Sequence, residues 1–494
     1  MGVRTSIHLE PMMAATAPRT MHSPLAYGVL MVLAAAGFLT PNPWESAWTL
    51  TLLAFILRWF WWKEYPGILL FCLLAPFIEI HTTVLEANTA GLTLDELYTG
   101  PGRQTFWMAS AGLFAVLLGF RTALGRIWHD LHPPMAGLQE AARSISQTKL
   151  LIATIAINTG GVMLNQAIPW GSPLQQLETY YASISSATTL CFALHFWLTR
   201  QRPWLVLVVF GYLLVTSFYS YFSAWRGPLT ILLVSILVTY KDFKLRQVLT
   251  LTPILIPAFV FVFVWQSVKG EYRMFLSSGE RQQVIRVSQA EALAEIWELA
   301  QTAYDQNQIW NDQVVNATYR RAGYLEYFSA AVSKVPTEIP HEKGALLQES
   351  LTFSFIPRLL NPNKGVKNDR IKVERYTDYY FGESSFSSFS LGHYCEAYID
   401  WGPFGMMLHL LCYGIVGGLL VRTTLKRTRH INPLLGLGLL WAVMYPWGTF
   451  QQDMVTVAGR TGWGAFCQLL LFFPIYMWTH RFVQQEESVP NAIQ

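Results

Sequence analysis

Charged residues are scarce in this chain. Asp, Glu, Lys and Arg make up 13% of the 494 residues, whereas soluble chains carry roughly 25%. So few charges cannot cover the surface of a soluble body of this size, but they suffice if lipid faces most of that surface. Because 52% of the residues are hydrophobic, disordered, collagen-like and coiled-coil classes are excluded as well.

Cysteine is also rare. The five cysteines form no Cys-x-x-Cys pair and no Cys/His spacing typical of a metal site, so neither a disulfide framework nor a structural zinc site is indicated. Four of them lie in apolar runs, where a thiol behaves as a small hydrophobe. Only Cys395 is expected near water.

Long apolar runs, by contrast, are abundant. A membrane helix needs about 20 mostly apolar residues, because the hydrocarbon core of a bilayer is about 30 Å thick. We therefore predict an all-α polytopic membrane protein of about twelve transmembrane helices, the first of them retained as an anchor. The predicted spans are 24–40, 45–61, 66–84, 104–120, 149–170, 177–199, 203–222, 228–240, 247–267, 398–421, 432–452 and 461–479.

The distribution of Lys and Arg predicts the orientation. If the tail 1–23 is cytoplasmic, eighteen Lys and Arg residues fall on the cytoplasmic side, and three fall in short outer loops. The remaining 14 lie in the long segment 268–397, which does not count in this comparison because long loops translocate regardless of charge. We therefore expect both termini inside, with 480–494 as a second cytoplasmic tail.

The segment between spans nine and ten, residues 268–397, is the one large extracytoplasmic loop. Apolar residues recur at helical spacing in 279–305, and Asn311 or Asp312 is a candidate cap for a second helix at 314–333. A third helix is expected at 344–354. The domain organisation is thus spans one to nine within 24–267, the loop, and spans ten to twelve within 398–479.

Charges in this loop are balanced in sum but not in distribution. With 14 basic and 16 acidic residues, the loop is not a nucleic-acid surface, which would be strongly of one sign. The cations nevertheless cluster, and Arg offers a planar fork of donors to phosphate oxygens. The basic cluster comprises Arg320, Arg321, Arg358, Lys364, Lys367, Arg370, Lys372 and Arg375. The alternative is a solvated, salt-bridged loop surface.

Two stretches of sequence carry a family resemblance. The first is SAWRGPLTILL (223–233); the second comprises IPRLLNPNKG (356–365) and SSFSLGHYCEAYIDWGPFG (387–405). Together with the late position of the large loop, they resemble the Wzy-type O-antigen and exopolysaccharide repeat-unit polymerases. The superfamily of these enzymes also contains the O-antigen ligases.

This resemblance implies a glycosyltransferase of the bacterial inner (cytoplasmic) membrane. Its substrate would be an oligosaccharide on undecaprenyl diphosphate, and the glycan would pass to the next lipid-linked repeat unit at the periplasmic face. The family is thought to use no metal and no cofactor, and the loop 41–44 (PNPW) carries no carboxylate. Membrane lipids, a chain-length regulator and a flippase are the expected partners, and nucleic acid is not.

The leaving diphosphate gains negative charge in the transition state, which fixed cations would stabilise. Arg226 is the first candidate, because it lies in a short outer turn at a helix start, where backbone N–H groups also favour an anion. The alternative is an arginine that snorkels to the interface. The other diphosphate-binding candidates are Arg358, Lys364, Arg460 and Arg321.

The acceptor hydroxyl must lose a proton, and a carboxylate or histidine at the same face could take it. Glu396 is the first candidate for this base or for a group that orients the acceptor, and His393 is the second. Glu349 and Asp453 are weaker. The alternative for Glu396 is an ion pair with Arg358 or another cation that holds the loop against the membrane.

Aromatic residues of the loop are candidates for stacking on sugar rings. These are Tyr379, Tyr380 and Trp401, and the alternative for each is an interfacial aromatic residue.

Three other functions stay open. A ligase would attach finished glycan to a different acceptor, and a transporter or flippase would move the lipid-linked sugar. A metal-dependent lipid-linked sugar transferase would lose its activity on chelation. Transporters place polar groups at mid-membrane on broken helices, whereas here the polar residues concentrate in one outer loop.

Overall fold

The architecture is that of a computed structural model of the whole chain. The structure describes residues 24–61, 67–125, 135–168, 175–202, 204–219, 225–239, 245–279, 285–356, 369–380, 389–428, 431–461 and 473–484. This described part is helical and contains no β-strand, which confirms the predicted all-α class. Arg358, Lys364 and the stretch 381–388 lie outside the described residues.

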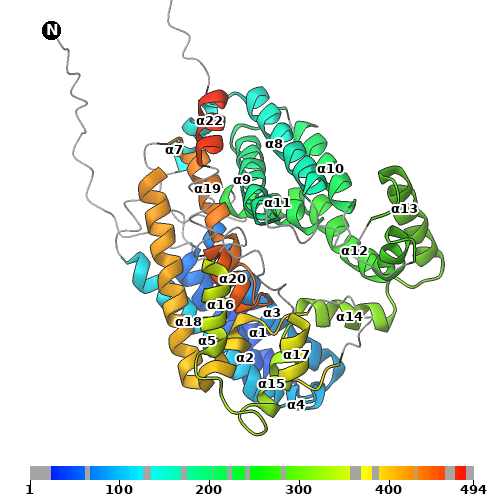
Figure 1. Cartoon of the computed structure of the whole chain (residues 1–494), viewed down its shortest axis with the longest axis vertical. Helices are drawn as coiled ribbons and strands as arrows, with labels where there is room; N and C mark the ends of the chain where they lie inside the picture. Colours follow the sequence, from blue (N-terminus) through cyan, green and yellow to red (C-terminus); the bar gives the residue numbers. More distant parts are fainter. Residues whose placement is uncertain are drawn as a thin grey trace, which may run out of the picture.

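Long helices precede and follow a set of shorter ones (Figure 1). The N-terminal helices are α1 (Pro24–Gly37), α2 (Pro43–Phe60), α3 (Gly67–Ala90), α4 (Leu94–Leu97), α5 (Gly102–Leu124), α7 (Met135–Arg143), α8 (Gln147–Ala167), α9 (Gln175–Thr199), α10 (Trp204–Phe218), α11 (Arg226–Thr239) and α12 (Leu245–Leu276). The shorter helices are α13 (Gln289–Asp305), α14 (Asp312–Ala322), α15 (Glu326–Lys334), α16 (Ala345–Phe355) and α17 (Asp369–Tyr376). The C-terminal helices are α18 (His393–Arg427), α19 (Pro433–Met444), the 3₁₀ turn η2 (Tyr445–Trp447), α20 (Met454–Thr461) and α22 (Phe473–Val483).

Three of the described helices, α3, α5 and α18, are long and apolar enough to cross a membrane. Every predicted span overlaps a described helix, but several boundaries differ. Helix α12 continues past the predicted end at 267, and α18 begins before the predicted start at 398. Within the last predicted span, 461–479, the described residues belong to the end of α20 and to α22.

The loop helices agree with the local sequence signals, with one exception. The first and third predicted loop helices are present as α13 and α16, and the side chain of Asn311 caps α14 by accepting the N–H of Val314 at 2.8 Å. The single helix predicted at 314–333 is wrong, because α14 and α15 are separate. Between them the N–H of Tyr324 donates to the Glu79 carbonyl of α3 at 2.9 Å, a tertiary contact that local periodicity does not reveal.

Helices α5 and α18 pack closely along their lengths. A Cβ built on Gly414 of α18 would lie 2.3 Å from the carbonyl oxygen of Val116 in α5. Such close backbone approach between apolar helices is typical of small residues at membrane-helix interfaces. Cys395, expected near water, is instead fully buried beside this interface, whereas Cys412 is the exposed thiol.

Chain segments far apart in sequence meet at one end of the molecule, near α7 and α22 (Figure 1). The N–H of Ser146 donates to the Val483 carbonyl at 2.9 Å, and the Asn432 side chain donates to the Ala141 carbonyl at 2.9 Å. The Gln147 side chain reaches the Gln201 carbonyl at 2.9 Å. The turns that follow α7, α9, α18 and α22 therefore share one end.

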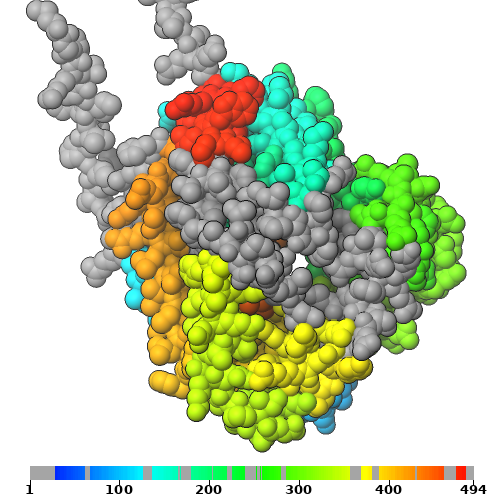
Figure 2. Space-filling view, in the orientation of Figure 1, coloured from blue at the N-terminus to red at the C-terminus, as the bar shows by residue number. Residues whose placement is uncertain are grey.

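The opposite end is formed by α4, α15 and the neighbouring loop helices (Figure 1). Figure 2 shows α15, α16 and α17, in yellow-green and yellow, over the face and end of the molecule away from α22. Tyr324 donates its hydroxyl to the Ser390 carbonyl at 2.6 Å, and Tyr398 donates to the Val335 carbonyl at 2.7 Å. The loop helices are thus attached directly to the start of α18.

A second, smaller hydrophobic cluster holds α12, α13 and α14 together, separate from the main core. Trp265 and Tyr272 of α12 pack edge to face at 5.7 Å, and Tyr272 donates to the Phe218 carbonyl of α10 at 2.9 Å. Trp225, which precedes α11, is buried in the same cluster. This packing brings α14 next to the start of α11.

Candidate functional site

A cavity of about 440 Å³ lies between α11, α12 and α14. Its wall is mostly apolar, with Leu229, Leu233 and Ile236 from α11 and Phe259 and Val262 from α12. Polar groups are few and lie toward α14 and the start of α11. A mostly apolar wall with a few convergent polar groups is typical of a ligand site.

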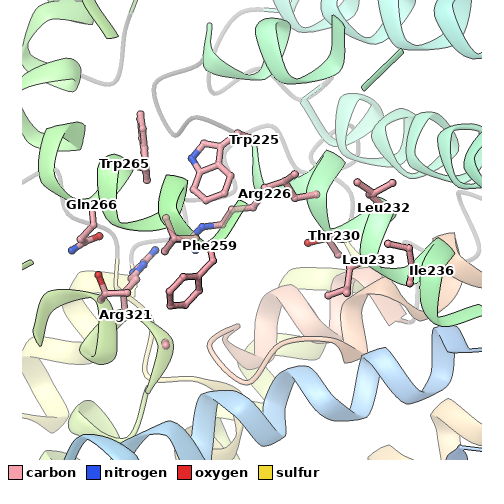
Figure 3. Close-up of a pocket in the computed structure, with 14 residues that line it drawn as sticks. Trp225, Arg226, Thr230, Leu232, Leu233, Ile236, Phe259, Trp265, Gln266 and Arg321 are labelled. Carbon is pink, nitrogen blue, oxygen red and sulfur yellow. The ribbon is translucent and has the colours of Figure 1, made fainter. Parts of the chain in front are cut away.

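Two arginines, Arg226 and Arg321, line this cavity from different parts of the chain. Arg226 is the first residue of α11, and Arg321 lies in the last turn of α14. Figure 3 shows their guanidinium groups pointing toward one another within the same space. Among the described residues neither forms an ion pair, and Arg226 also lies over the Trp225 ring at 5.8 Å. The structure therefore brings together two of the predicted diphosphate-binding residues.

Helix α12 adds two further cations, Lys269 and Arg273, beyond the cavity residue Gln266. Lys269 donates to the Gln266 side chain at 2.7 Å. Burial, together with Arg321, Arg273 and Arg226, lowers the pKa of the Lys269 ammonium to about 8. Residues 262, 266, 269 and 273 share one helix face by their spacing. That spacing was the available sequence signal for the two cations, which the sequence analysis missed.

One carboxylate, Glu79 of α3, faces this group of cations. It interacts electrostatically with both Arg226 and Arg321. Its carboxylate accepts the backbone N–H groups of Phe450 and Gln451, which follow η2. Glu79 lies within the predicted span 66–84 and was not among the candidates, although an ionisable residue in a membrane span is by default a functional candidate.

The cavity is recessed from the ends of the longer helices. Helix α11 has 14 residues, about 21 Å, which is short of the about 30 Å of a bilayer core. Its end lies at the start of α3, because a Cβ on Gly67 would be 2.5 Å from the carbonyl carbon of Leu237. Arg226, at the other end of α11, therefore lies beside the middle of α3, near Glu79.

Glu396 lies in a separate, buried ion-pair network. Lys372 of α17 contacts Glu396 at 3.3 Å and Glu349 of α16 at 3.5 Å. The other carboxylate oxygen of Glu396 accepts the N–H of Met454 at 2.5 Å. Burial lowers the pKa of the Lys372 ammonium, but Glu396, Glu349 and Asp453 together raise it above the ordinary lysine value. The ion pair corresponds to the alternative interpretation of Glu396, in which a cation of the loop is held at the start of α18.

His393, the first residue of α18, is buried against the rings of Tyr394 and Tyr413, at 4.6 and 4.9 Å. Neither of its ring nitrogens has a hydrogen-bond partner in the described part of the chain. Its backbone N–H donates to the Gln452 carbonyl at 2.7 Å. Neither His393 nor Glu396 lines the cavity.

The segment 448–454 connects the two groups of residues. Glu79 accepts the N–H of Phe450, and Glu396 accepts the N–H of Met454. The backbone of this short segment is thus held at one point by the carboxylate beside the cations and at another by the carboxylate paired with Lys372. A shift at either carboxylate moves the same piece of chain.

The remaining predicted site residues lie elsewhere. Arg460 is half-buried in the last turn of α20, which packs on α16 through a bond from the Ser354 hydroxyl to the Val455 carbonyl at 3.0 Å. Arg358 and Lys364 are outside the described residues. Within the described ranges, no group of three or more His, Cys, Asp or Glu residues is arranged to hold a metal ion.

The aromatic candidates fall into three different environments. Tyr379 donates to Glu326 of α15 at 2.6 Å and packs edge to face on Tyr327 at 5.1 Å. Tyr380 is exposed. Trp401 is half-buried, with its ring 5.3 Å from that of His409. The three are not in one cluster, and none lines the cavity.

Together, the fold and the cavity define an all-helical protein that has helices suited to a membrane and a cavity lined by two arginines. The chain belongs to the family whose model is described as Domain of unknown function (DUF8712), which matches residues 127–426. That range includes Arg226, Arg321 and Glu396, whereas Glu79 and Arg460 fall outside it. Comparisons with curated proteins and with solved structures gave no match.

Proposed function

We propose that the protein is a polysaccharide polymerase of the bacterial inner membrane. It would transfer a glycan from a polyprenyl diphosphate carrier to the next lipid-linked repeat unit, without a metal. The observation that carries the proposal is the convergence of Arg226 and Arg321 on one mostly apolar cavity. A lipid diphosphate has the matching chemistry, with a dianionic head and a hydrocarbon tail.

The transfer breaks the bond between the anomeric carbon and the carrier phosphate oxygen, and it forms a bond from that carbon to the acceptor hydroxyl. The electron pair of the broken bond remains on the diphosphate. Arg226 and Arg321 would stabilise that charge. The proton of the acceptor hydroxyl goes to a base, which is not assigned because neither Glu396 nor His393 lines the cavity.

We propose the predicted topology of about twelve spans with both termini inside. The chain segments that meet at the two ends of the molecule support this topology. The turns after α7, α9 and α18 and the end of α22, all predicted as cytoplasmic, meet at one end, and α15 and α17 of the segment 268–397 lie toward the other. Arg226, in a predicted outer turn, lies next to the loop helix α14, consistent with this alternation.

Arginine substitution with a matched control tests the proposal. Arg226→Ala and Arg321→Ala should abolish polymer when the purified protein is reconstituted with undecaprenyl-diphosphate-linked oligosaccharide. Arg320→Ala is the control, because Arg320 is adjacent in sequence but does not line the cavity, and it faces Glu86 at 3.9 Å. Wild-type chain lengths from both Arg226→Ala and Arg321→Ala would refute the diphosphate site.

The product separates the proposal from its alternatives. A ladder of repeat lengths indicates a polymerase, and glycan on an unrelated acceptor indicates a ligase. A flippase is the second candidate, because the cavity is lined by α11 and α12, which overlap two predicted spans, and transporters hold their substrates between membrane helices. Transfer of unmodified substrate across the liposome membrane, with no new glycosidic bond, would identify it. Activity that persists after chelation excludes the metal-dependent transferase.

A further inference from the structure

We propose that Glu79 is a positioning residue of the cationic cavity, whose negative charge keeps diphosphate binding weak enough for the spent carrier to leave. This inference rests on the proposed function. Nothing in the sequence analysis or in the family match points to Glu79, and the proposal depends on the tertiary arrangement of α3, α11, α12 and α14.

The fold places Glu79 of α3 close to the arginines that α11 and α14 carry. Just after the end of α14, the N–H of Tyr324 donates to the backbone carbonyl of Glu79 at 2.9 Å. Arg321 therefore lies three residues before a backbone contact with Glu79 itself. Arg226, the first residue of α11, lies at a similar position along α3, because the far end of α11 contacts Gly67 at the start of α3.

The charge balance gives this carboxylate its effect. Arg226, Arg321, Lys269 and Arg273 interact with one another electrostatically, and Glu79 is a carboxylate coupled to both cavity arginines. The two cavity arginines, with Lys269 and Arg273 close to the cavity, would bind a diphosphate tightly before and after the reaction. Binding the carrier equally well in substrate and product does not speed turnover. A nearby negative charge lowers the affinity for the anion.

The carboxylate is also fixed in place. Phe450 and Gln451 donate backbone N–H groups to it, so the carboxylate stays at its position next to the arginines and cannot swing away. A glutamine side chain retains an oxygen that accepts one of these N–H groups but removes the charge. The substitution Glu79→Gln therefore separates the electrostatic role from the structural one.

The test measures binding of inorganic pyrophosphate and of undecaprenyl diphosphate to the full-length protein in lipid nanodiscs at pH 8. Glu79→Gln should bind both probes about tenfold more tightly, because a repulsive charge is removed. In the reconstituted polymerase reaction, both KM for the donor and kcat should fall, since carrier release becomes slower. Glu79→Asp, which keeps the charge, should remain within about twofold of the wild type.

Glu86→Gln is the matched control, because Glu86 lies two turns along α3 and faces Arg320 instead of Arg321; it should not change the affinity. Glu79→Met serves as a second uncharged variant if Glu79→Gln is not recovered folded, and it should tighten binding as well. A merely structural role would weaken binding in the uncharged variants.

Weaker or unchanged pyrophosphate binding in Glu79→Gln and Glu79→Met, with weakened binding in Arg321→Ala, would overturn the role of Glu79 alone. Normal polymer from both Arg226→Ala and Arg321→Ala would instead overturn the proposed function. The two failures are therefore distinguishable.

Discussion

Replacing Lys372 by Met removes the cation of the buried network at the start of α18. The Glu396 side chain is 1% exposed and that of Lys372 is 15% exposed, and their charged atoms are 3.3 Å apart. Without Lys372, the Glu396 carboxylate keeps the N–H of Met454 as a donor but lies buried without its ion-pair partner. We therefore expect α17 and the segment 448–454 to open more readily.

Removing one partner of a buried ion pair costs about 3–5 kcal/mol, and we expect about 3 kcal/mol here because one hydrogen bond to Glu396 remains. By the conversion of about 1.4 kcal/mol per factor of ten, amide exchange in 369–376 should become about a hundred times faster. The double substitution Lys372→Met/Glu396→Gln removes the unpaired charge and keeps an acceptor for Met454. It should recover most of the loss.

Hydrogen exchange measured by mass spectrometry tests the predicted change in the exchange rate of α17, with Lys334→Met as the control. The Lys334–Asp378 pair is shorter, at 2.6 Å, but the Asp378 side chain is 83% exposed, so its loss should cost only about 0–1 kcal/mol. An exchange rate in α17 that changes less in Lys372→Met than in Lys334→Met would refute the reasoning. Since the pKa of Lys372 is raised, the contribution of its charge is fully present at neutral pH and is lost only as the pH rises above the ordinary lysine pKa.

Two further predictions concern the cavity and the packing. Because the pKa of Lys269 is lowered to about 8, its charge is lost between about pH 7 and pH 9; pyrophosphate binding should weaken over that range, and less so in Lys269→Met. An equal pH dependence in both proteins would remove Lys269 from the site. Gly414→Ile should prevent the close approach of α5 and α18, and size-exclusion chromatography should then show aggregated protein. Gly211→Ile is the control: because the space around Gly211 is open, this variant should elute as a monodisperse peak.

The helical class and several individual helices followed from local properties of the sequence. Apolar runs form helices in lipid because every backbone polar group must be satisfied within its own segment. A local cap likewise predicts α14, since the Asn311 side chain accepts the N–H of Val314. The Ser288 side chain caps α13 in the same way by accepting the N–H of Glu291, although periodicity and not this cap predicted that helix. These interactions join residues three positions apart, so they can be recognised from the sequence alone.

The candidate arginines could be identified from residue type and position, but their association could not. Arg226 and Arg321 are separated by almost a hundred residues, and Arg320, next to Arg321, faces a different carboxylate on α3. Which of two consecutive arginines enters the cavity depends on the rotation of α14 about its axis, which its packing on α3 and α12 sets.

By itself, then, the sequence determined the elements: apolar helices, a helical loop and a surplus of cations at particular turns. Only the tertiary structure decided the pairings, with Glu79 near the arginines, Lys269 near the cavity through Gln266, and Lys372 on Glu396. The physical reason is the different range, along the chain and in space, over which these interactions act. Helix formation depends on neighbours within a few residues, whereas the charge environment of a site depends on distances in space between helices that are remote in the chain.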